Sequence, residues 1–315
     1  IKLPYRTSSI GPDFFPGVPL RFPPYLHQEK AFRRLSGEQP TSTIIATGTG
    51  SGKTECFLYP ILDYCRRHRG EPGIKAIIIY PMNALATDQA KRIARLIHDN
   101  PNLKNQIKAG LYIGGQQGEH ASPVMGRENI ITDRDTLRLS PPDILLTNYK
   151  MLDYLLIRPR DFPLWKENGL DTLKYLVVDE IHTFDGAQGT DLACLIRRLK
   201  SRLKLEKERL CCVGTSATLG EKETQRICTY AGKVFGETHD LVLLMGSLLE
   251  MAMRGVSAEQ GALLIASETK DRLRVAASKG FPDTVRPGDE VGSADELWRL
   301  AGFPSEIASS VIPLT

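Results

Sequence analysis

The stretch IIATGTGSGKTECFLYPIL, residues 44–62, decides the fold, because a β-branched apolar run is followed at once by three glycines in five positions. The apolar run predicts a strand, and the pattern after Lys53 predicts an amphipathic helix. Gly48, Gly50 and Gly52 let the chain turn tightly, so that successive backbone N–H groups point at an anion. The helix start adds the positive end of its dipole, about half a charge. The stretch therefore predicts a phosphate cradle.

The whole turn is expected to contribute to this cradle. Lys53 is expected to reach the β- and γ-phosphates of a nucleotide, and the Thr54 hydroxyl to ligate Mg²⁺. The strict signature has Gly at position 47, where this chain has Thr. The alternative is a glycine-rich connection without a ligand. The expected ATP-binding residues of the turn are Thr47, Gly48, Thr49, Gly50, Ser51, Gly52, Lys53 and Thr54.

Composition sets the outer bounds. The chain has 315 residues, is 41% hydrophobic and 25% charged, and carries a formal net charge of +4, which permits a polyanionic partner without requiring one. No stretch approaches the length of a membrane span and the N-terminus has no signal layout, so a cytoplasmic location and no membrane partner are expected. The six cysteines include no C-x-x-C pair and are expected to be reduced core residues.

Short β-branched runs alternate with longer helical patterns along the first two thirds of the chain. Buried runs joined by helices predict a parallel sheet covered on both faces, whose ligand lies beyond the carboxyl ends of the strands. The predicted strands are 43–47, 75–81, 108–113, 143–148, 174–180 and 210–216, and the predicted helices lie near 53–69, 83–99, 148–157 and 186–204.

Two adjacent carboxylates end one of these strands. In KYLVVDEIH, residues 174–182, Asp179 and Glu180 follow an apolar run. Neighbouring side chains diverge at a strand end, so one carboxylate can hold Mg²⁺ while the next addresses the attacking water. This assigns Asp179 to the metal and Glu180 to the base. The alternative is a solvated strand cap or a helix start.

Several motifs in order carry a family resemblance. TGTGSGKT, DEIH at 179–182 and SAT at 216–218 resemble motifs I, II and III of the superfamily 2 DExH-box nucleic-acid helicases, in the first of their two RecA-like domains. The longer wording DEIHTFDGAQGTDLACLIRRL is closest to the Lhr- and YprA-like branch, which includes large helicase subunits of bacterial antiphage systems such as Druantia and DISARM. The resemblance covers roughly residues 20–236.

The resemblance implies further roles. PPYLHQEKAF, residues 23–32, is similar to the Q motif, in which Gln28 would read the adenine edge and Tyr25 would stack on the ring. The hydroxyls of Ser216 and Thr218 would couple the nucleotide to the strand-binding face, although Ser and Thr also form simple turns. His182 would join this coupling by contacting nucleotide-side residues of the second domain, although a lone His is more often a packed or surface residue.

The residues expected to contact nucleic acid lie at other strand ends. YPMNALATDQ, 80–89, resembles motif Ia, and LLTNYKMLDYLL, 145–156, resembles the T-N segment that binds the strand backbone. Short polar side chains and free N–H groups at a helix start suit phosphate oxygens and are blind to the base. Plain helix capping is the alternative. The expected contacts are Pro81, Asn83, Gly114, Gly115, Thr147 and Asn148.

The chain is expected to have three parts. Residues 1–42 are an extended lead-in with the Q-motif-like segment, 43–239 a RecA-like P-loop domain of the α/β class, and 240–315 a mainly helical accessory module or insertion. Helices are predicted over 241–255, 257–278 and 293–303, the last with a Ser293-x-x-Glu296 capping box.

The resemblance implies an ATP- and Mg²⁺-dependent helicase or translocase working on single-stranded DNA in the 3′ to 5′ direction, with defence-system subunits as possible partners. No Q-x-x-G-R-x-G-R-like motif is present, so a second RecA-like domain is expected to supply arginines, and these 315 residues are expected to hydrolyse ATP weakly. An ATP-gated DNA-binding scaffold that does not unwind remains the alternative. A small-molecule kinase is disfavoured by Gln28, and DNA and RNA are not distinguished.

Overall fold

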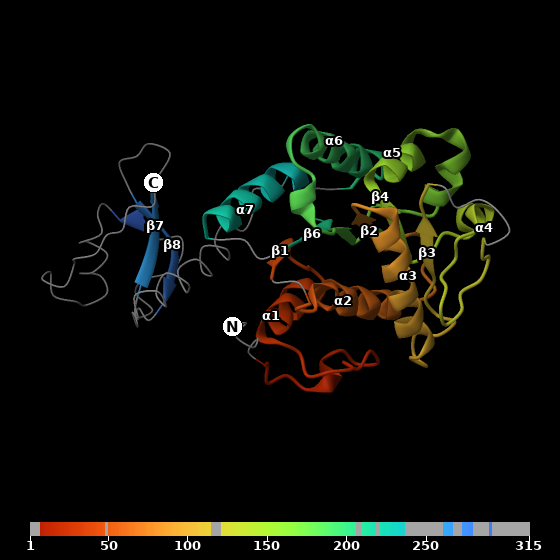
Figure 1. Ribbon diagram of the computed structural model, residues 1–315, viewed down its shortest axis with the longest axis horizontal. Coiled ribbons are helices and arrows are strands. Elements are labelled where there is room, and N and C mark those ends of the chain that lie inside the picture. The colour runs from red at the N-terminus through yellow and green to blue at the C-terminus, as the bar shows by residue number, and fades with distance from the viewer. Residues whose placement is uncertain are drawn as a thin grey trace, which may run out of the picture. The chain divides into compact units, whose positions relative to one another are not determined.

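The computed structural model divides the chain into two compact units, Ile1–Glu237 and Thr238–Thr315. It describes residues 7–47, 50–114, 121–205, 209–217, 221–236, 261–266, 273–279 and 290–291. The first unit contains the labelled helices and the strands β1 to β6 in Figure 1. Within the described residues, no helix combines the length and the apolar character needed to cross a bilayer.

A six-stranded parallel sheet forms the centre of the first unit, in the order β1-β6-β5-β2-β4-β3. Every residue of β2 and β5 is buried, which is the pattern of strands covered on both faces. All six predicted strands are confirmed. Their bounds are β1 Thr43–Ala46, β2 Ala76–Tyr80, β3 Ala109–Tyr112, β4 Ile144–Asn148, β5 Tyr175–Val178 and β6 Cys211–Ser216.

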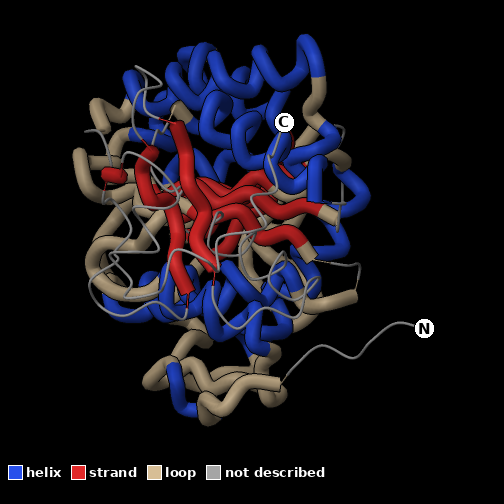
Figure 2. Tube along the Cα trace, turned by 90° about the vertical axis from the view of Figure 1, so that its left-hand side faces the viewer, coloured by secondary structure: helices blue, strands red, loops and turns tan. Residues whose placement is uncertain are grey.

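Helices cover both faces of this sheet, as Figure 2 shows. On one face α1, α2 and α3 pack on the sheet, and on the other α5, α6 and α7 do so. The predicted α/β class is confirmed. The α-helices are α1 Leu26–Leu35, α2 Lys53–Arg67, α3 Asn83–His98, α4 Arg134–Leu139, α5 Tyr149–Ile157, α6 Gly186–Arg202 and α7 Glu221–Phe235, and the 3₁₀ helices are η1 Pro12–Phe14, η2 Pro159–Trp165 and η3 Ile181–Thr183.

Residues 7–25, the described part of the lead-in before α1, form a strap over the first unit. Phe15 is buried and packs edge-on against Phe32 of α1. The backbone carbonyl of Gly17 accepts hydrogen bonds from the side chains of Asn100 and Asn102, after α3. The strap is therefore tied to two helices on the same face of the sheet.

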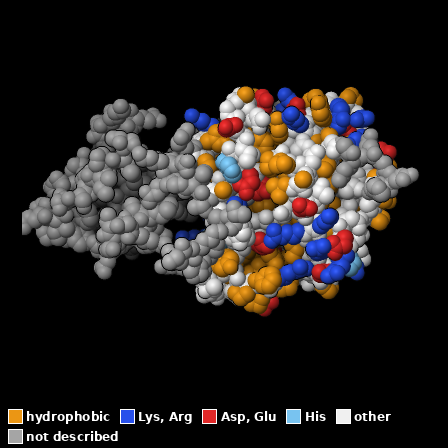
Figure 3. All heavy atoms as spheres, viewed as in Figure 1, with side chains coloured by type: hydrophobic (Ala, Val, Ile, Leu, Met, Phe, Trp, Pro, Cys, Tyr) orange, Lys and Arg blue, Asp and Glu red, His pale blue; other side chains and the backbone are white. Residues whose placement is uncertain are grey.

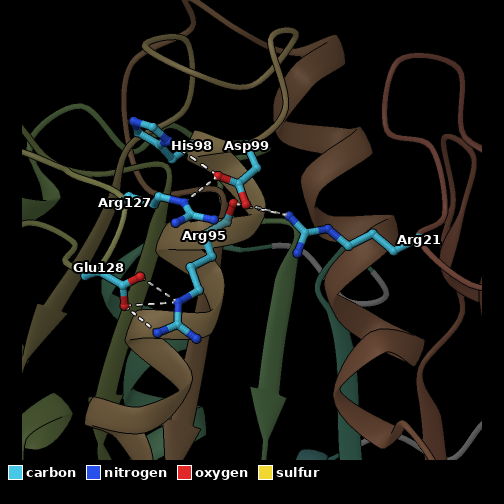
Figure 4. A network of polar contacts seen from close by, with 6 residues as sticks. All are labelled: Arg21, Arg95, His98, Asp99, Arg127 and Glu128. Atoms are coloured by element: carbon cyan, nitrogen blue, oxygen red, sulfur yellow. Dashed lines mark hydrogen bonds and ion pairs between the residues drawn. The ribbon is translucent and has the colours of Figure 1, made fainter.

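An ion network fixes the strap further, and Figure 4 shows its members. Asp99 at the end of α3 accepts from Arg21 of the strap at 3.3 Å and from Arg127 at 3.0 Å. Arg95 pairs with Glu128 beside them. The hydrogen bond from Arg127 holds the pKa of Asp99 below its usual range. Figure 3 shows Lys/Arg and Asp/Glu side chains gathered over the α2 and α3 side of this unit.

The second unit contradicts the expectation of a mainly helical segment where it is described. It contains an antiparallel sheet of β7 Gly261–Ala266, β8 Leu273–Lys279 and β9 Glu290–Val291. The helix predicted over 257–278 is wrong there, because short apolar runs such as GALLIA and LRVAAS do not distinguish a strand from a helix. The helices predicted over 241–255 and 293–303 lie outside the described residues.

The expectation that all six cysteines are core residues holds for four of them. No disulfide joins the six, all of which lie in the described part of the chain, and Cys56, Cys65, Cys211 and Cys212 are buried as predicted. Cys194 is exposed on α6 and Cys228 is half-buried, so the prediction of a core position is wrong for Cys194. Burial raises the pKa of the Cys56 thiol to about 12, which makes it unreactive.

Candidate nucleotide and nucleic-acid site

The carboxyl edge of the sheet has two halves. At one end β1, β6 and β5 finish side by side, with Ala46 opposite Ser216 and Val178 opposite Gly214. At the other end β2, β4 and β3 finish together, with Tyr80 opposite Asn148. The predicted phosphate and Mg²⁺ residues follow strands of the first group, and the predicted nucleic-acid residues lie at or just after the ends of the second group. Ligands of open parallel sheets bind beyond this edge.

The glycine turn closes on itself after β1. The hydroxyls of Thr47 and Ser51 are 2.6 Å apart, and Lys53 Nζ donates to the Thr47 carbonyl at 3.2 Å. Gly50 and Gly52 have φ of +79° and +78°, in the left-handed region that glycine adopts without strain. Gly48 and Thr49 lie outside the described residues. Thr47, which replaces the signature glycine, therefore helps to shape the turn.

The turn and the acidic pair meet, as predicted. Lys53 Nζ lies 3.4 Å from Glu180 Oε1, and their side chains are 11% and 28% exposed. Lys53 comes from the start of α2 and Glu180 from the end of β5, so two distant segments bring opposite charges to one place. Both residues line a cavity of about 660 Å³, together with Asp179, Thr54 and Gln28.

Thr215 of β6 orients the acidic pair. Its hydroxyl donates to Asp179 Oδ1 at 2.5 Å and accepts from the Glu180 backbone N–H at 2.9 Å. Glu180 has φ of +49°, an unusual conformation for a residue with a side chain, which costs about 1 kcal/mol or more. The hydroxyl of a fully buried threonine thus holds both the carboxylate and the strained turn.

Burial raises the pKa of Asp179, and the Thr215 hydrogen bond opposes that rise. A carboxylate in such a setting is stabilised by a cation. Thr54 and Asp179 both line the cavity and offer a hydroxyl and a carboxylate oxygen, which are the hard oxygen ligands that Mg²⁺ prefers. The residues present therefore fit Mg²⁺ held by one or two protein ligands together with nucleotide phosphates.

The Q-motif-like segment lies against the same turn. Gln28 Oε1 accepts from the Tyr25 backbone N–H at 2.8 Å, and Gln28 Nε2 donates to the Gly52 carbonyl at 3.1 Å. His27 contacts the Ser51 carbonyl at 3.0 Å and stacks on Tyr25. Burial lowers the pKa of His27, so its neutral ring donates from Nε2. Gln28 and Tyr25 thus border the cavity and also brace the turn.

The residues expected to couple the two halves are partly in place. Ser216 Oγ and His182 Nδ1 are 3.1 Å apart, and His182 Nδ1 lies 3.4 Å from Glu180 Oε2. This joins the end of β6 to the acidic pair. Thr218 lies outside the described residues.

The predicted nucleic-acid residues form a second cluster. Asn148 Nδ2 donates to Asn83 Oδ1 at 2.7 Å, and Asn83 Nδ2 reaches the Gly114 carbonyl at 3.5 Å. Asn148 also caps α5 by accepting from the Met151 N–H, so the capping alternative holds beside any contact role. Asn83 is exposed, Pro81 is half-buried, and Gly115 lies outside the described residues.

Thr147 does not face outward with this cluster. It is fully buried, and its hydroxyl donates to the Tyr112 carbonyl at 2.7 Å. Its side chain therefore ties β4 to β3 and leaves any nucleic-acid contact to its neighbours.

Several residues of the site were missed from the sequence. Thr215 could have been found, because it precedes the predicted Ser216 on a strand that ends beside Asp179. His27 sits next to the predicted Gln28. Glu55 and Gln89, which also line the cavity, carry no motif signal of their own.

Residues 25–227 match the family model of the DEAD/DEAH box helicases. The match spans most of the first unit, and the chain belongs to this family. The predicted resemblance to superfamily 2 helicases is confirmed, and the relatives named below include YprA of the predicted branch.

Two curated relatives illustrate the likeness. The Druantia protein DruE of Escherichia coli is 31% identical, over 66% of this chain and 16% of its own length. The uncharacterized ATP-dependent helicase YprA of Bacillus subtilis is 30% identical, over 62% of this chain and 23% of its own. The chain thus spans about a quarter or less of these relatives.

Among solved structures, the DUF1998 helicase MrfA bound to DNA is 25% identical with a TM-score of 0.50, and the match covers 68% of this chain and 26% of MrfA. The predicted fold is therefore confirmed by an independent comparison.

Proposed function

We propose that the first unit is the first motor domain of an ATP-dependent helicase or translocase that moves along DNA. The observation that carries this proposal is the 3.4 Å approach of Lys53 Nζ to Glu180 Oε1 in the large cavity. A phosphate-binding cation and a candidate base meet there beside the buried carboxylate of Asp179. No structural role requires that arrangement, because it gathers charges where burial is costly.

The residues divide the work. Lys53 and the N–H groups of the turn bind the triphosphate, and Thr54 with Asp179 holds Mg²⁺, which neutralises the charge that develops on the phosphoryl oxygens. Phosphate oxygens compete with Glu180 for Lys53, because both are anionic. Glu180, released from Lys53, is then placed to orient the attacking water. Thr215 keeps Asp179 and Glu180 in register during this exchange.

A second RecA-like domain is proposed to complete the site. An arginine finger is worth about 10³ to 10⁵ in rate in phosphoryl transfer. We therefore expect these 315 residues to bind ATP but to show little DNA-stimulated hydrolysis. Strong stimulation by single-stranded DNA would contradict the need for that second domain.

DNA as the track is supported by the likeness to MrfA, whose structure contains DNA. The cluster of Asn83, Asn148 and Gly114 is proposed to contact the phosphate backbone, which carries no base identity. Movement from 3′ to 5′ is proposed from the family resemblance, and a cytoplasmic location stays a prediction from the sequence. The likeness to DruE supports a role in antiphage defence with other subunits as partners.

The test compares Lys53→Ala and Glu180→Gln with wild type, in this chain and in any longer protein that contains it. We expect Lys53→Ala to weaken ATP binding at least about tenfold, since a charge-assisted contact is lost. Glu180→Gln should bind ATP but not hydrolyse it. Lys166→Ala, an exposed lysine after η2, is the matched control.

Measuring strand separation by the longer protein distinguishes the motor from the scaffold alternative. Its loss in both variants, with DNA binding intact, supports the motor. Strand separation that survives both changes refutes it. ATP-dependent DNA binding with no strand separation by the wild type favours the scaffold alternative.

A further inference from the structure

Two polar atoms of the cavity have no hydrogen-bond partner among the described residues and do not belong to the phosphate machinery. They are Glu55 Oε2 of α2 and Gln89 Oε1 of α3, and both atoms are buried. Both residues line the cavity that holds Lys53 and Glu180. A buried acceptor without a donor loses its hydrogen bond to water and gains none in return, so these two atoms need an explanation.

The phosphates of a nucleotide cannot supply it. Phosphate oxygens accept hydrogen bonds, and an ionised glutamate also only accepts. The donors of a nucleotide are the amine of its base and the hydroxyls of its ribose. The unpartnered oxygens therefore point to recognition of the nucleoside rather than of the triphosphate.

Glu55 is held in place for such a contact. Its other oxygen, Oε1, pairs with Arg92 of α3. Burial lowers the pKa of Arg92, and a guanidinium still stays charged in proteins. One oxygen of the carboxylate is thus engaged, and the second remains available to the cavity.

Gln28 lies next to this free oxygen. A Cβ placed on Gly52 would be 2.3 Å from Gln28 Nε2 and 3.1 Å from Glu55 Oε2. Gln28 Nε2 and Glu55 Oε2 therefore lie no farther apart than the sum of these two distances. A donor and an acceptor stand side by side, close enough to contact one small planar group.

The orientation of Gln28 is fixed by its partners. The Tyr25 N–H is a donor and requires Oε1, while the Gly52 carbonyl is an acceptor and requires Nε2. Nε2 keeps one further N–H beyond the bond to Gly52. The amide nitrogen, not its oxygen, is thus the group nearer to Glu55.

We infer that Glu55 Oε2 accepts the hydrogen bond of the adenine amine and makes the site select adenine over guanine. This inference rests on the proposed function of the same site. One edge of adenine presents N7 as an acceptor and N6 as a donor, whereas the same edge of guanine presents two acceptors, N7 and O6. Gln28 Nε2 and Glu55 Oε2 match the first edge. Guanine would set O6 against the carboxylate.

The test measures equilibrium binding of ATP and GTP to the 315-residue chain in the presence of Mg²⁺. A matched donor–acceptor pair is worth about 1–3 kcal/mol of discrimination, so the wild type should prefer ATP by about 5-fold to 150-fold. Glu55→Gln can turn its amide toward O6, and it should reduce that preference to within about threefold. Glu38→Gln is the matched control, because Glu38 also pairs with an arginine but is 82% exposed.

Two analogues separate the base from the sugar. Purine riboside triphosphate, which lacks the amine, should bind the wild type more weakly than ATP, whereas Glu55→Ala, which has no acceptor for the amine, should bind the two about equally. If 2′-deoxy-ATP or 3′-deoxy-ATP shows that pattern instead, Glu55 reads the ribose and the inference is overturned. Circular dichroism verifies that each variant is folded.

The outcome also separates this inference from the proposed function. If the wild type binds no nucleotide, or Lys53→Ala binds as well as wild type, the proposed function fails. If Lys53→Ala loses both nucleotides but Glu55→Gln keeps the wild-type ratio of ATP to GTP affinity, only the role of Glu55 fails.

Discussion

The carboxylate of Asp161 in η2 is fully buried. Replacing Asp161 should show how much one buried charge contributes to the free energy of unfolding. Its Oδ1 accepts from the Tyr112 hydroxyl at 2.8 Å and from Arg138 Nε at 2.9 Å, and its Oδ2 lies 2.8 Å from Arg158 Nε. Tyr112 ends β3, whose carbonyl holds Thr147. The network therefore supports the strand ends beneath Asn148.

Asp161→Ala leaves two arginines and a tyrosine hydroxyl without their shared acceptor. Breaking a buried ion pair by removing one partner costs about 3–5 kcal/mol. The side chains of Arg138 and Arg158 are 17% and 27% exposed, so water can partly replace the lost carboxylate. We therefore expect a loss at the lower end, about 3 kcal/mol. With a urea slope of about 3 kcal/mol per molar, the unfolding midpoint should fall by about 1 M.

Asp135→Ala is the internal control, because Asp135 pairs with the same Arg138 but is 82% exposed. An exposed pair contributes about 0–1 kcal/mol, so the midpoint should fall by about 0.3 M or less. Urea unfolding followed by circular dichroism measures both. If Asp161→Ala shifts the midpoint no more than Asp135→Ala, burial does not set the strength of this network and the reasoning is wrong.

Two further substitutions test the nucleotide half. Asp179→Asn removes a buried carboxylate, so the variant should melt at a higher temperature than wild type when nucleotide and Mg²⁺ are absent. Its Mg²⁺-dependent ATP binding should be weaker. A melting temperature below that of wild type would contradict this reasoning. Burial lowers the pKa of His27 below its usual 6.5, so the unfolded chain binds the proton more readily than the folded chain. The stability that neutral His27 contributes is therefore fully present above pH 6.5 and is lost as the pH falls below that value. The urea midpoint of wild type should therefore fall more than that of His27→Gln between pH about 7.5 and about 5.5, and equal falls would rule out this role.

The strands and the phosphate turn could be predicted because their signals are local. Short runs of apolar residues bounded by turns define the strands, and parallel pairing places all their ends at one edge. Lys53 and Glu180 are far apart in the sequence, yet each follows a strand of the same sheet. Their meeting follows from topology alone.

What could not be predicted depends on which way a side chain points. Thr147 matches a nucleic-acid motif, but its hydroxyl donates a hydrogen bond to the Tyr112 carbonyl inside the sheet. Thr215 has no motif role in the sequence, but it holds the acidic pair because β6 lies beside β5. The helix predicted over 257–278 is wrong at β7 and β8 because their apolar runs are too short for the spacing of apolar residues to distinguish a helix from a strand.

Several unfavourable features of the first unit meet at the nucleotide cavity. Asp179 is a buried carboxylate and Glu180 has a left-handed backbone. Glu55 Oε2 and Gln89 Oε1 are buried without a hydrogen-bond partner among the described residues. A sequence selected for stability alone would remove such features, since each costs on the order of 1 kcal/mol or more. A ligand that brings a divalent cation, an attacking water and a donor amine would relieve the buried charge and the unpartnered oxygens together. This relief supports the proposal that the cavity binds a metal–nucleotide complex.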